Sequence, residues 1–240
     1  MRALLLAAGK GTRLRPLTED RPKPMIDVAG RPILEHNVRL LARHGVCDLV
    51  INLHHRPEVI VGHFGDGARF GVSIAYSYEP ELLGTAGALN PIRSRLEETF
   101  LVVYADNLTT CNLTQLLRLH RQARATATLS LFERERVNES GIVGLEGERI
   151  TRFLEKPARG QEFSRWVNAG IVALEPAALT FIPPVGFYDI GRDLLPALLA
   201  SGARLSGYRM SEPLWWIDST GDYERVIADP TVAALLGADS

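Results

Sequence analysis

The stretch that decides the fold lies at residues 3–14 and reads ALLLAAGKGTRL. Its apolar start predicts a buried first strand, and the small residues that follow predict a tight turn at the end of that strand. The backbone of such a turn can approach an anion closely, and Arg13 adds a cation that can bind the anion through two hydrogen bonds. Pro22 and Pro24 flank Lys23 and keep it on a stiff, non-helical segment. These residues predict a phosphate-binding site.

Two common phosphate loops do not fit this turn. The Walker pattern fails because Lys10 is followed by Gly11 and no glycine stands five residues earlier. The dinucleotide fingerprint fails because Leu14 stands where its third glycine is needed. The prolines at positions 16, 22 and 24 also exclude the long helix that follows either motif. A purely structural strand-to-helix turn is the alternative for the glycines taken alone.

Composition narrows the class of protein. With 240 residues, 46% of them hydrophobic, and a formal net charge of −1, we expect a packed globular chain without a nucleic-acid or membrane partner. The first strand begins next to the initiator methionine, and no apolar run approaches the ~20 residues of a membrane span, so we expect a cytoplasmic protein. Cys47 and Cys111 are expected to be buried thiols rather than a disulfide. Homo-oligomerisation is left open.

Strand and helix patterns alternate up to about residue 132. The expected strands cover 48–53, 72–78, 100–104 and 126–132, and the expected helices cover 32–44, 57–64, 84–96 and 113–124, the last capped by Asn112. Such alternation predicts a mostly parallel sheet with helices on both faces.

Beyond residue 132 the pattern changes. A hairpin around Gly147, with strands 141–145 and 149–155, and a further strand at 167–174 are expected as antiparallel additions to the same sheet. A late strand is expected at 204–210. Helices are expected at 189–199 and 221–227. Because no linker or low-complexity tract interrupts the chain, we expect one domain over residues 1–240.

Two aspartates follow apolar runs that predict strands. Asp106 follows residues 101–104, and Asp218 follows the tryptophan pair at 215 and 216. Ligands of open α/β sheets bind beyond the carboxyl ends of the strands, and Mg²⁺ prefers carboxylate oxygen. We therefore expect Asp106 and Asp218 to share one Mg²⁺ site. The alternative is a capping or turn role for each aspartate, and it is the stronger for Asp218, because Ser219 or Thr220 already offers a cap for the helix that follows.

At this point the motifs resemble those of the sugar nucleotidyltransferase family, whose members join a nucleoside triphosphate to a sugar 1-phosphate. Residues 6–14, with 16–18 and 22–25, resemble its nucleotide-binding signature, and 79–88 (EPELLGTAGA) resemble its base-recognition loop. Residues 104–106 resemble its metal-binding strand end, with Ala105 in place of the usual glycine. Residues 153–157 and 167–170 resemble its sugar-phosphate elements, and 216–218 resemble its second metal position. These motifs follow the family's order across nearly the whole chain.

The resemblance implies a Rossmann-like three-layer α/β/α sandwich with a mixed, mainly parallel central sheet, whose sugar-phosphate part covers roughly residues 133–220. It also implies that the sugar phosphate attacks the α-phosphorus and releases pyrophosphate. The implied catalytic residues are Arg13, Lys23, Asp106, Lys156 and Asp218. The implied nucleotide-binding residues are Leu6, Ala7, Ala8, Gly9, Gly11, Thr12, Arg13, Lys23, Glu79, Gly84, Thr85 and Asp106. The implied sugar-phosphate residues are Asn107, Gly141, Glu155, Lys156 and Asn168.

The base and the sugar are harder to predict. Guanine offers two adjacent donors that one carboxylate can accept together, whereas uracil and thymine present acceptors that a carboxylate repels. Glu79 stands where thymidylyl and uridylyl members carry glutamine, so it favours GTP, with mannose or heptose 1-phosphate as the acceptor. The alternatives are a thymidylyl- or uridylyltransferase acting on glucose 1-phosphate or an amino-sugar 1-phosphate, and a non-catalytic nucleotide-sensing subunit.

Overall fold

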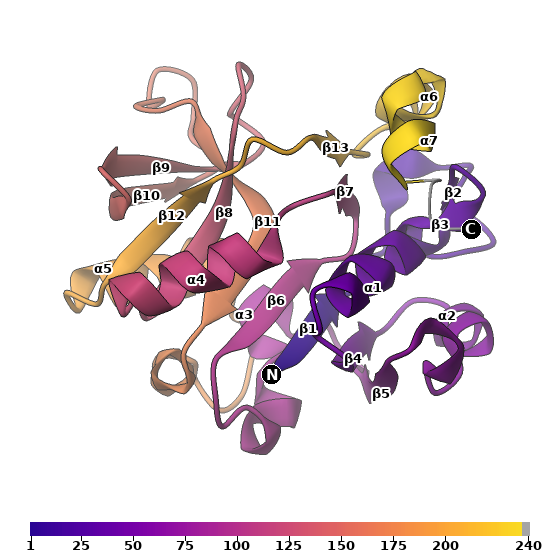
Figure 1. Ribbon diagram of the computed structural model, residues 1–240, viewed down its shortest axis with the longest axis horizontal. Helices are drawn as coiled ribbons and strands as arrows, with labels where there is room; N and C mark the ends of the chain where they lie inside the picture. Colours follow the sequence, from indigo (N-terminus) through magenta and orange to yellow (C-terminus); the bar gives the residue numbers. More distant parts are fainter. Residues whose placement is uncertain (237–240) are drawn as a thin grey trace. The chain divides into compact units, whose positions relative to one another are not determined.

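The computed structural model describes residues 1–236, and its contacts divide the chain into two compact units. The amino-terminal unit comprises Arg2–Glu81, Val103–Cys111 and the described residues from Glu212 onward. The central unit comprises Met1, Leu82–Val102 and Asn112–Ser211. Figure 1 labels their helices and strands. The single-domain organisation stays a prediction.

A parallel group of strands forms the centre of the amino-terminal unit. β1 (Arg2–Leu6), β4 (Asp48–Leu53) and β5 (Ser73–Tyr78) lie in the order β5-β4-β1, and both neighbouring pairs are parallel. The carboxyl ends of parallel strands meet at one edge of a sheet. β6 (Phe100–Tyr104) follows β1 in this order, and the Ala105 amide after it donates to the carbonyl oxygen of Leu6 at 3.3 Å. Four strand ends therefore share one edge.

Helices and short ladders complete this unit. α1 (Ile33–Arg43) buries Leu34, Val38 and Leu41 at helical spacing, as its sequence pattern predicts. The other elements are α2 (Pro57–Phe64), α6 (Thr220–Ala228), α7 (Pro230–Leu236), 3₁₀ turns at Thr12–Leu14, Lys23–Met25 and Ala68–Phe70, and two-stranded ladders of β2 (Asp27–Val28) with β3 (Arg31–Pro32) and of β7 (Asn107–Thr109) with β13 (Leu214–Trp216).

The central unit carries a mixed group of strands in the order β6-β11-β8-β12-β10-β9. Their bounds are Ala127–Glu133 for β8, Gly141–Glu146 for β9, Arg149–Glu155 for β10, Trp166–Leu174 for β11 and Leu205–Arg209 for β12. β12 runs parallel to β8, whereas the pairs β11–β8, β10–β12 and β9–β10 are antiparallel. The mixed α/β character is thus confirmed, although parallel pairing dominates only in the amino-terminal unit. The three-layer arrangement stays a prediction.

The helices of the central unit contain one correction. α4 (Leu113–Ala123) is capped by the Asn112 side chain, which accepts from the Gln115 amide at 3.1 Å, as predicted. The continuous helix predicted over 84–96 is wrong: α3 (Gly84–Gly87) is one turn long, and a 3₁₀ helix follows at Asn90–Arg95. Pro91 explains the break, since it has no N–H and disfavours α geometry at the residue before it. A 3₁₀ helix at Pro176–Phe181, a π-helical turn at Ile190–Leu194 and α5 (Leu195–Ala200) complete the unit.

Other expectations have clear outcomes. The hairpin around Gly147 is confirmed, with the glycine in the left-handed region at φ +61°. Cys111 is buried but Cys47 is exposed, so the prediction of two buried thiols is wrong for Cys47. No helix within residues 1–236 is long and apolar enough to cross a membrane.

Candidate active site

Lys23 and Thr18 pack closely against the glycine turn after β1. Gly11 adopts φ +59°, and a Cβ atom built there would lie 2.8 Å from the Cβ of Lys23 and 3.1 Å from Cγ2 of Thr18. The Thr18 hydroxyl also donates to the Gly11 carbonyl oxygen at 2.9 Å. Only glycine fits this position, because both its backbone conformation and the space beside it exclude a side chain. A Cβ on Gly9 would instead meet no described atom within 4 Å, so the turn has open space on that side.

The start of the turn is occupied by a side chain that the sequence analysis did not single out. Oδ1 of Asn52, near the end of β4, accepts from the amides of Ala7 and Ala8 at 2.6 and 3.2 Å. These two amides therefore donate to a protein side chain, and the nucleotide-binding role of Ala7 and Ala8 stays a prediction. Among the described residues, the amides of Gly9 and Lys10 have no such partner. The part of the turn open to an anion thus begins at Gly9.

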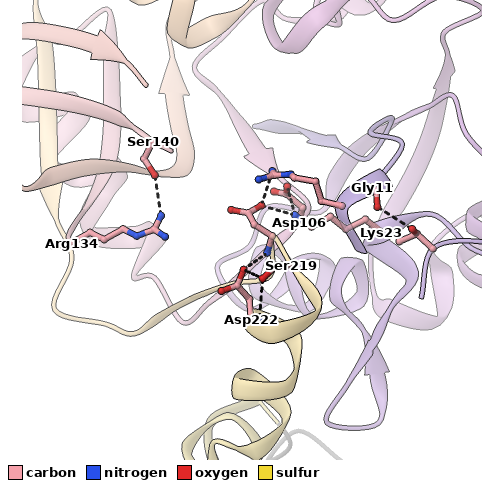
Figure 2. Close-up of polar contacts among 10 residues, drawn as sticks. Gly11, Lys23, Asp106, Arg134, Ser140, Ser219 and Asp222 are labelled. Atoms are coloured by element: carbon pink, nitrogen blue, oxygen red, sulfur yellow. Dashed lines mark hydrogen bonds and ion pairs between the residues drawn. The ribbon is translucent and has the colours of Figure 1, made fainter. Parts of the chain in front are cut away.

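Lys23 brings the two predicted metal ligands together. Its Nζ donates to Oδ2 of Asp106 at 2.8 Å and to Oδ1 of Asp218 at 3.1 Å (Figure 2). Arg13 also reaches Oδ1 of Asp218 at 3.3 Å, with its side chain 65% exposed. Burial alone would lower the pKa of Lys23, but the charges and hydrogen bonds of both aspartates outweigh burial and raise it. Lys23 is therefore held as a cation.

The β7–β13 ladder explains why the two aspartates meet. Asn107 on β7 pairs with Trp216 on β13 in an antiparallel ladder. Asp106, one residue before Asn107, and Asp218, two residues after Trp216, therefore come to the same end of the ladder. Ser219 caps α6 by accepting from the Asp222 amide at 3.2 Å, and Oδ2 of Asp222 accepts from the Asp218 amide at 3.2 Å (Figure 2). This reciprocal capping holds the backbone of Asp218 at the start of the helix.

The donor set fits a hard divalent cation. Two carboxylate oxygens converge on one ammonium group, which shows that they can face a single positive charge. Mg²⁺ binds in this way through one or two carboxylates, and it completes its coordination with water and phosphate oxygens. Within residues 1–236 no group of three or more histidine, cysteine, aspartate or glutamate side chains could hold a metal.

Glu79, the predicted base-recognition residue, lies at the end of β5 and is only 1% exposed. Its Oε1 accepts from Nδ2 of Asn52 at 2.8 Å, and its backbone carbonyl oxygen lies 2.8 Å from Nδ1 of His54. Because a carbonyl oxygen only accepts, His54 must carry its proton on Nδ1. Asn52 therefore connects Glu79 with Ala7 and Ala8.

Gly84 and Thr85, the other predicted base-loop residues, belong to the central unit and contact the chain near Tyr188. Gly84 adopts φ +79°, and a Cβ there would lie 2.5 Å from the Tyr188 carbonyl oxygen. That oxygen also accepts from the amides of Ala86 and Gly87 at 2.9 Å each. The Thr85 hydroxyl donates to Oδ2 of Asp189 at 2.8 Å. These residues therefore have a structural role, and their nucleotide-binding role stays a prediction.

Glu155, at the end of β10, lies in a cradle formed by two glycines. A Cβ on Gly141 would fall 2.6 Å from its Oε2, and a Cβ on Gly191 would fall 2.4 Å from the same atom. Burial raises the pKa of Glu155, and the nearby charge of Asp189 raises it further. The sequence analysis named Gly141 but missed Gly191, which comes near Glu155 only through the fold.

The remaining predicted sugar-phosphate residues differ in setting. Lys156 is exposed in the left-handed region at φ +47°, and its amide donates to the Ser140 carbonyl oxygen at 3.2 Å. Asn168 uses its Oδ1 to accept from the Gly170 amide at 3.1 Å, next to the register shift between β11 and β8. Asn107 lies on β7 of the amino-terminal unit rather than in the central unit.

Comparisons with known proteins agree on one family. A family model described as nucleotidyl transferase matches residues 2–227. A UTP–glucose-1-phosphate uridylyltransferase of Synechocystis is 39% identical over 233 residues, which cover 91% of this chain and 60% of that protein. A mannose-1-phosphate guanylyltransferase of Mycobacterium tuberculosis is 36% identical over 238 residues, which cover 95% of this chain and 64% of that protein. The chain thus spans less than two thirds of the length of these two relatives.

Solved structures show the same fold. A crystal structure of a candidate glucose-1-phosphate thymidylyltransferase from Bacillus anthracis, in complex with sucrose, superposes with a TM-score of 0.87. The two proteins are 21% identical, and the match covers 100% of this chain and 96% of the other. At this identity the likeness shows a shared fold alone.

Proposed function

We propose that this chain, which belongs to the nucleotidyl transferase family, transfers a nucleoside monophosphate from a nucleoside triphosphate to a sugar 1-phosphate and releases pyrophosphate. The observation that carries the proposal is the meeting of Asp106 and Asp218 on the buried ammonium of Lys23. The adjoining glycine turn has open space beside Gly9, which suits the close approach of a phosphate.

In this proposal the protein supplies charge and position rather than a base. A sugar phosphate is mostly dianionic at neutral pH, since its second pKa is about 6, so it can attack without losing a proton to the enzyme. Arg13 and Lys23 hold the triphosphate and the leaving pyrophosphate, and Asp106 with Asp218 hold Mg²⁺. The metal, when bound, neutralises charge on the phosphate oxygens. Orientation in line and charge stabilisation account for the rate of such transfers.

The residues of the central unit are proposed to bind the sugar phosphate. The exposed Lys156 binds its phosphate group, and Glu155 accepts hydrogen bonds from sugar hydroxyls. Gly141 supports this role, because its missing side chain leaves room for the Glu155 carboxylate. Asn168 is proposed as a further polar contact in this unit, and Asn107, which belongs to the amino-terminal unit, is proposed to contact the sugar phosphate as well.

GTP with mannose or heptose 1-phosphate is the proposed substrate pair. Its support is Glu79, a buried carboxylate held at the end of β5, because a carboxylate can accept both adjacent donors of guanine. A UTP and glucose 1-phosphate pair is the second candidate. The 39% identity to the Synechocystis uridylyltransferase favours it, as against 36% to the guanylyltransferase.

Pyrophosphate release tests the proposal. The purified protein is assayed with Mg²⁺, each of four nucleoside triphosphates and several sugar 1-phosphates. We expect release with at least one pair, a loss of about 100-fold or more in Asp106→Asn, and an unchanged circular dichroism spectrum for that variant. Lys156→Ala should raise KM for the sugar 1-phosphate with little change in nucleotide affinity. Nucleotide binding without release for any pair would instead indicate a sensing subunit.

A further inference from the structure

Asn52 is a buried polar residue inside an apolar strand. Asn52 is 3% exposed, and its neighbours Ile51 and Leu53 on β4 are buried hydrophobic residues. A buried amide without partners costs roughly 1 to 3 kcal/mol, so such a residue needs its hydrogen bonds. Asn52 makes three of them, two to the start of the glycine turn and one to Glu79.

The chemistry of these partners determines how the amide is oriented. Ala7 and Ala8 offer N–H donors, so the oxygen of Asn52 must face them. Glu79 offers a carboxylate oxygen, so the NH₂ group must face it. The reverse orientation would place donors against donors and an oxygen against a carboxylate. Asn52 therefore joins the two segments in only one way.

The partners of Asn52 belong to both halves of the nucleotide site proposed above. The turn is proposed to bind phosphates, and Glu79 is proposed to bind the base. Glu79 is 1% exposed, and its Oε1 accepts from Nδ2 of Asn52 at 2.8 Å. A hydrogen bond to a charged group is worth about 1.5 to 3 kcal/mol, enough to orient a carboxylate. Moving Asn52 would thus disturb base recognition and phosphate binding together.

We propose that Asn52 is a positioning residue that sets nucleotide discrimination, because it holds the Glu79 carboxylate in a fixed position relative to the glycine turn. The inference rests on the proposed nucleotidyl transfer, and it holds for whichever base the wild-type protein prefers. The hydrogen bonds of Asn52 are to Ala7, Ala8 and Glu79, so it acts through the turn and through Glu79.

Two substitutions separate the two contacts. Asn52→Ala removes both, so we expect about tenfold weaker binding of inorganic tripolyphosphate. We call the kcat/KM for the preferred of GTP and UTP, divided by that for the other, the base ratio, and we expect it to fall about tenfold. Asn52→Asp keeps an acceptor for Ala7 and Ala8 but replaces the donor to Glu79 by a like charge. At about pH 9.5, above the pKa of about 8 to 9 that buried carboxyls can reach, it should bind tripolyphosphate within about twofold of wild type and still lose the base ratio.

Ser77→Ala is the matched control. Ser77 is also buried, and it is the register partner of Asn52 on the neighbouring strand β5. This variant should retain both tripolyphosphate affinity and the base ratio. Tripolyphosphate binding is measured by calorimetry, the base ratio by pyrophosphate release, and folding by thermal melting.

The outcomes distinguish this inference from the proposed function. A wild-type protein that releases no pyrophosphate overturns the proposed function. An active wild type together with a folded Asn52→Asp that keeps the base ratio within twofold overturns the role of Asn52. Equal losses of the base ratio in Ser77→Ala and Asn52→Asp overturn it as well, because packing alone would then explain both. If Asn52→Ala does not fold, Asn52→Asp still decides the question.

Discussion

Replacing Lys23 with methionine removes the ammonium that lies between Asp106 and Asp218 and keeps an unbranched side chain in its place. Nζ is 2.8 Å from one carboxylate and 3.1 Å from the other, so the variant leaves two negative charges facing each other. We expect a loss of folding stability that depends on whether a divalent metal is present.

The magnitude follows from the geometry. Two unit charges about 5 Å apart repel by roughly 3 kcal/mol at an effective dielectric constant of 20. The Asp106 side chain is 38% exposed, and solvent weakens this repulsion. We therefore expect Lys23→Met to lower the free energy of unfolding by about 2 kcal/mol in EDTA, below the 3 to 5 kcal/mol of a fully buried pair. Arg13→Met is the matched control: Arg13 contacts Asp218 but is 65% exposed, so about 0 to 1 kcal/mol is expected.

Urea unfolding in EDTA and in excess Mg²⁺ measures these changes. A ligand at 100 times its Kd stabilises the folded state by about 2.7 kcal/mol. In the wild type Mg²⁺ competes with Lys23 for the carboxylates, so its stabilising effect should be larger in Lys23→Met. Equal losses for Lys23→Met and Arg13→Met in EDTA would refute the reasoning. So would an Mg²⁺ effect that is the same in wild type and Lys23→Met.

Three further predictions follow from single residues. Gly11→Ala forces a side chain into the left-handed region 2.8 Å from Lys23 Cβ, so urea unfolding should show a loss of roughly 2 to 4 kcal/mol, and an unchanged stability would contradict the packing described. Burial raises the pKa of Glu155, so the folded state binds more protons than the unfolded one and stability falls as pH rises above 4.5 through that raised pKa. Glu155→Gln should therefore be more stable than wild type at neutral pH and no more stable in acid below 4.5, and a pH-independent difference in melting temperature would count against it. Burial raises the pKa of Cys111 while Cys47 is exposed, so a maleimide should label one thiol in the native protein and two in denaturant, with two native labels as the contrary result.

Much of the local structure could be predicted because its causes lie within a few residues. The apolar run of β1 and the turn of small residues after it depend on neighbouring residues, and the structure has the strand where the sequence predicts it. The Asn112 cap likewise depends on a side chain and an amide three residues apart. The helix predicted over 84–96 shows the limit of periodicity. Its apolar spacing indicates one helix, but the α-helix ends before Pro91 and a 3₁₀ helix follows.

The candidate site was predicted only in part, since its residues are distant in sequence. Asp106 and Asp218 were paired because each follows an apolar run that predicts a strand, but nothing in the local sequence indicates that Lys23 lies between them. Their meeting depends on the β7–β13 ladder, whose three-residue strands are too short to show a period. Asn52 was missed because it reads as one polar residue in an apolar strand.

The sequence by itself determined the residue types that this protein can bring to phosphate chemistry, and the turns and strands whose energetics are local. The tertiary structure alone decided which of those residues meet. Propensity and capping act over a turn or two of chain, whereas the contacts of Lys23, Asn52 and Glu155 join segments that strand pairing brings together. The contacts between side chains, rather than the sequence motifs, therefore define the candidate site.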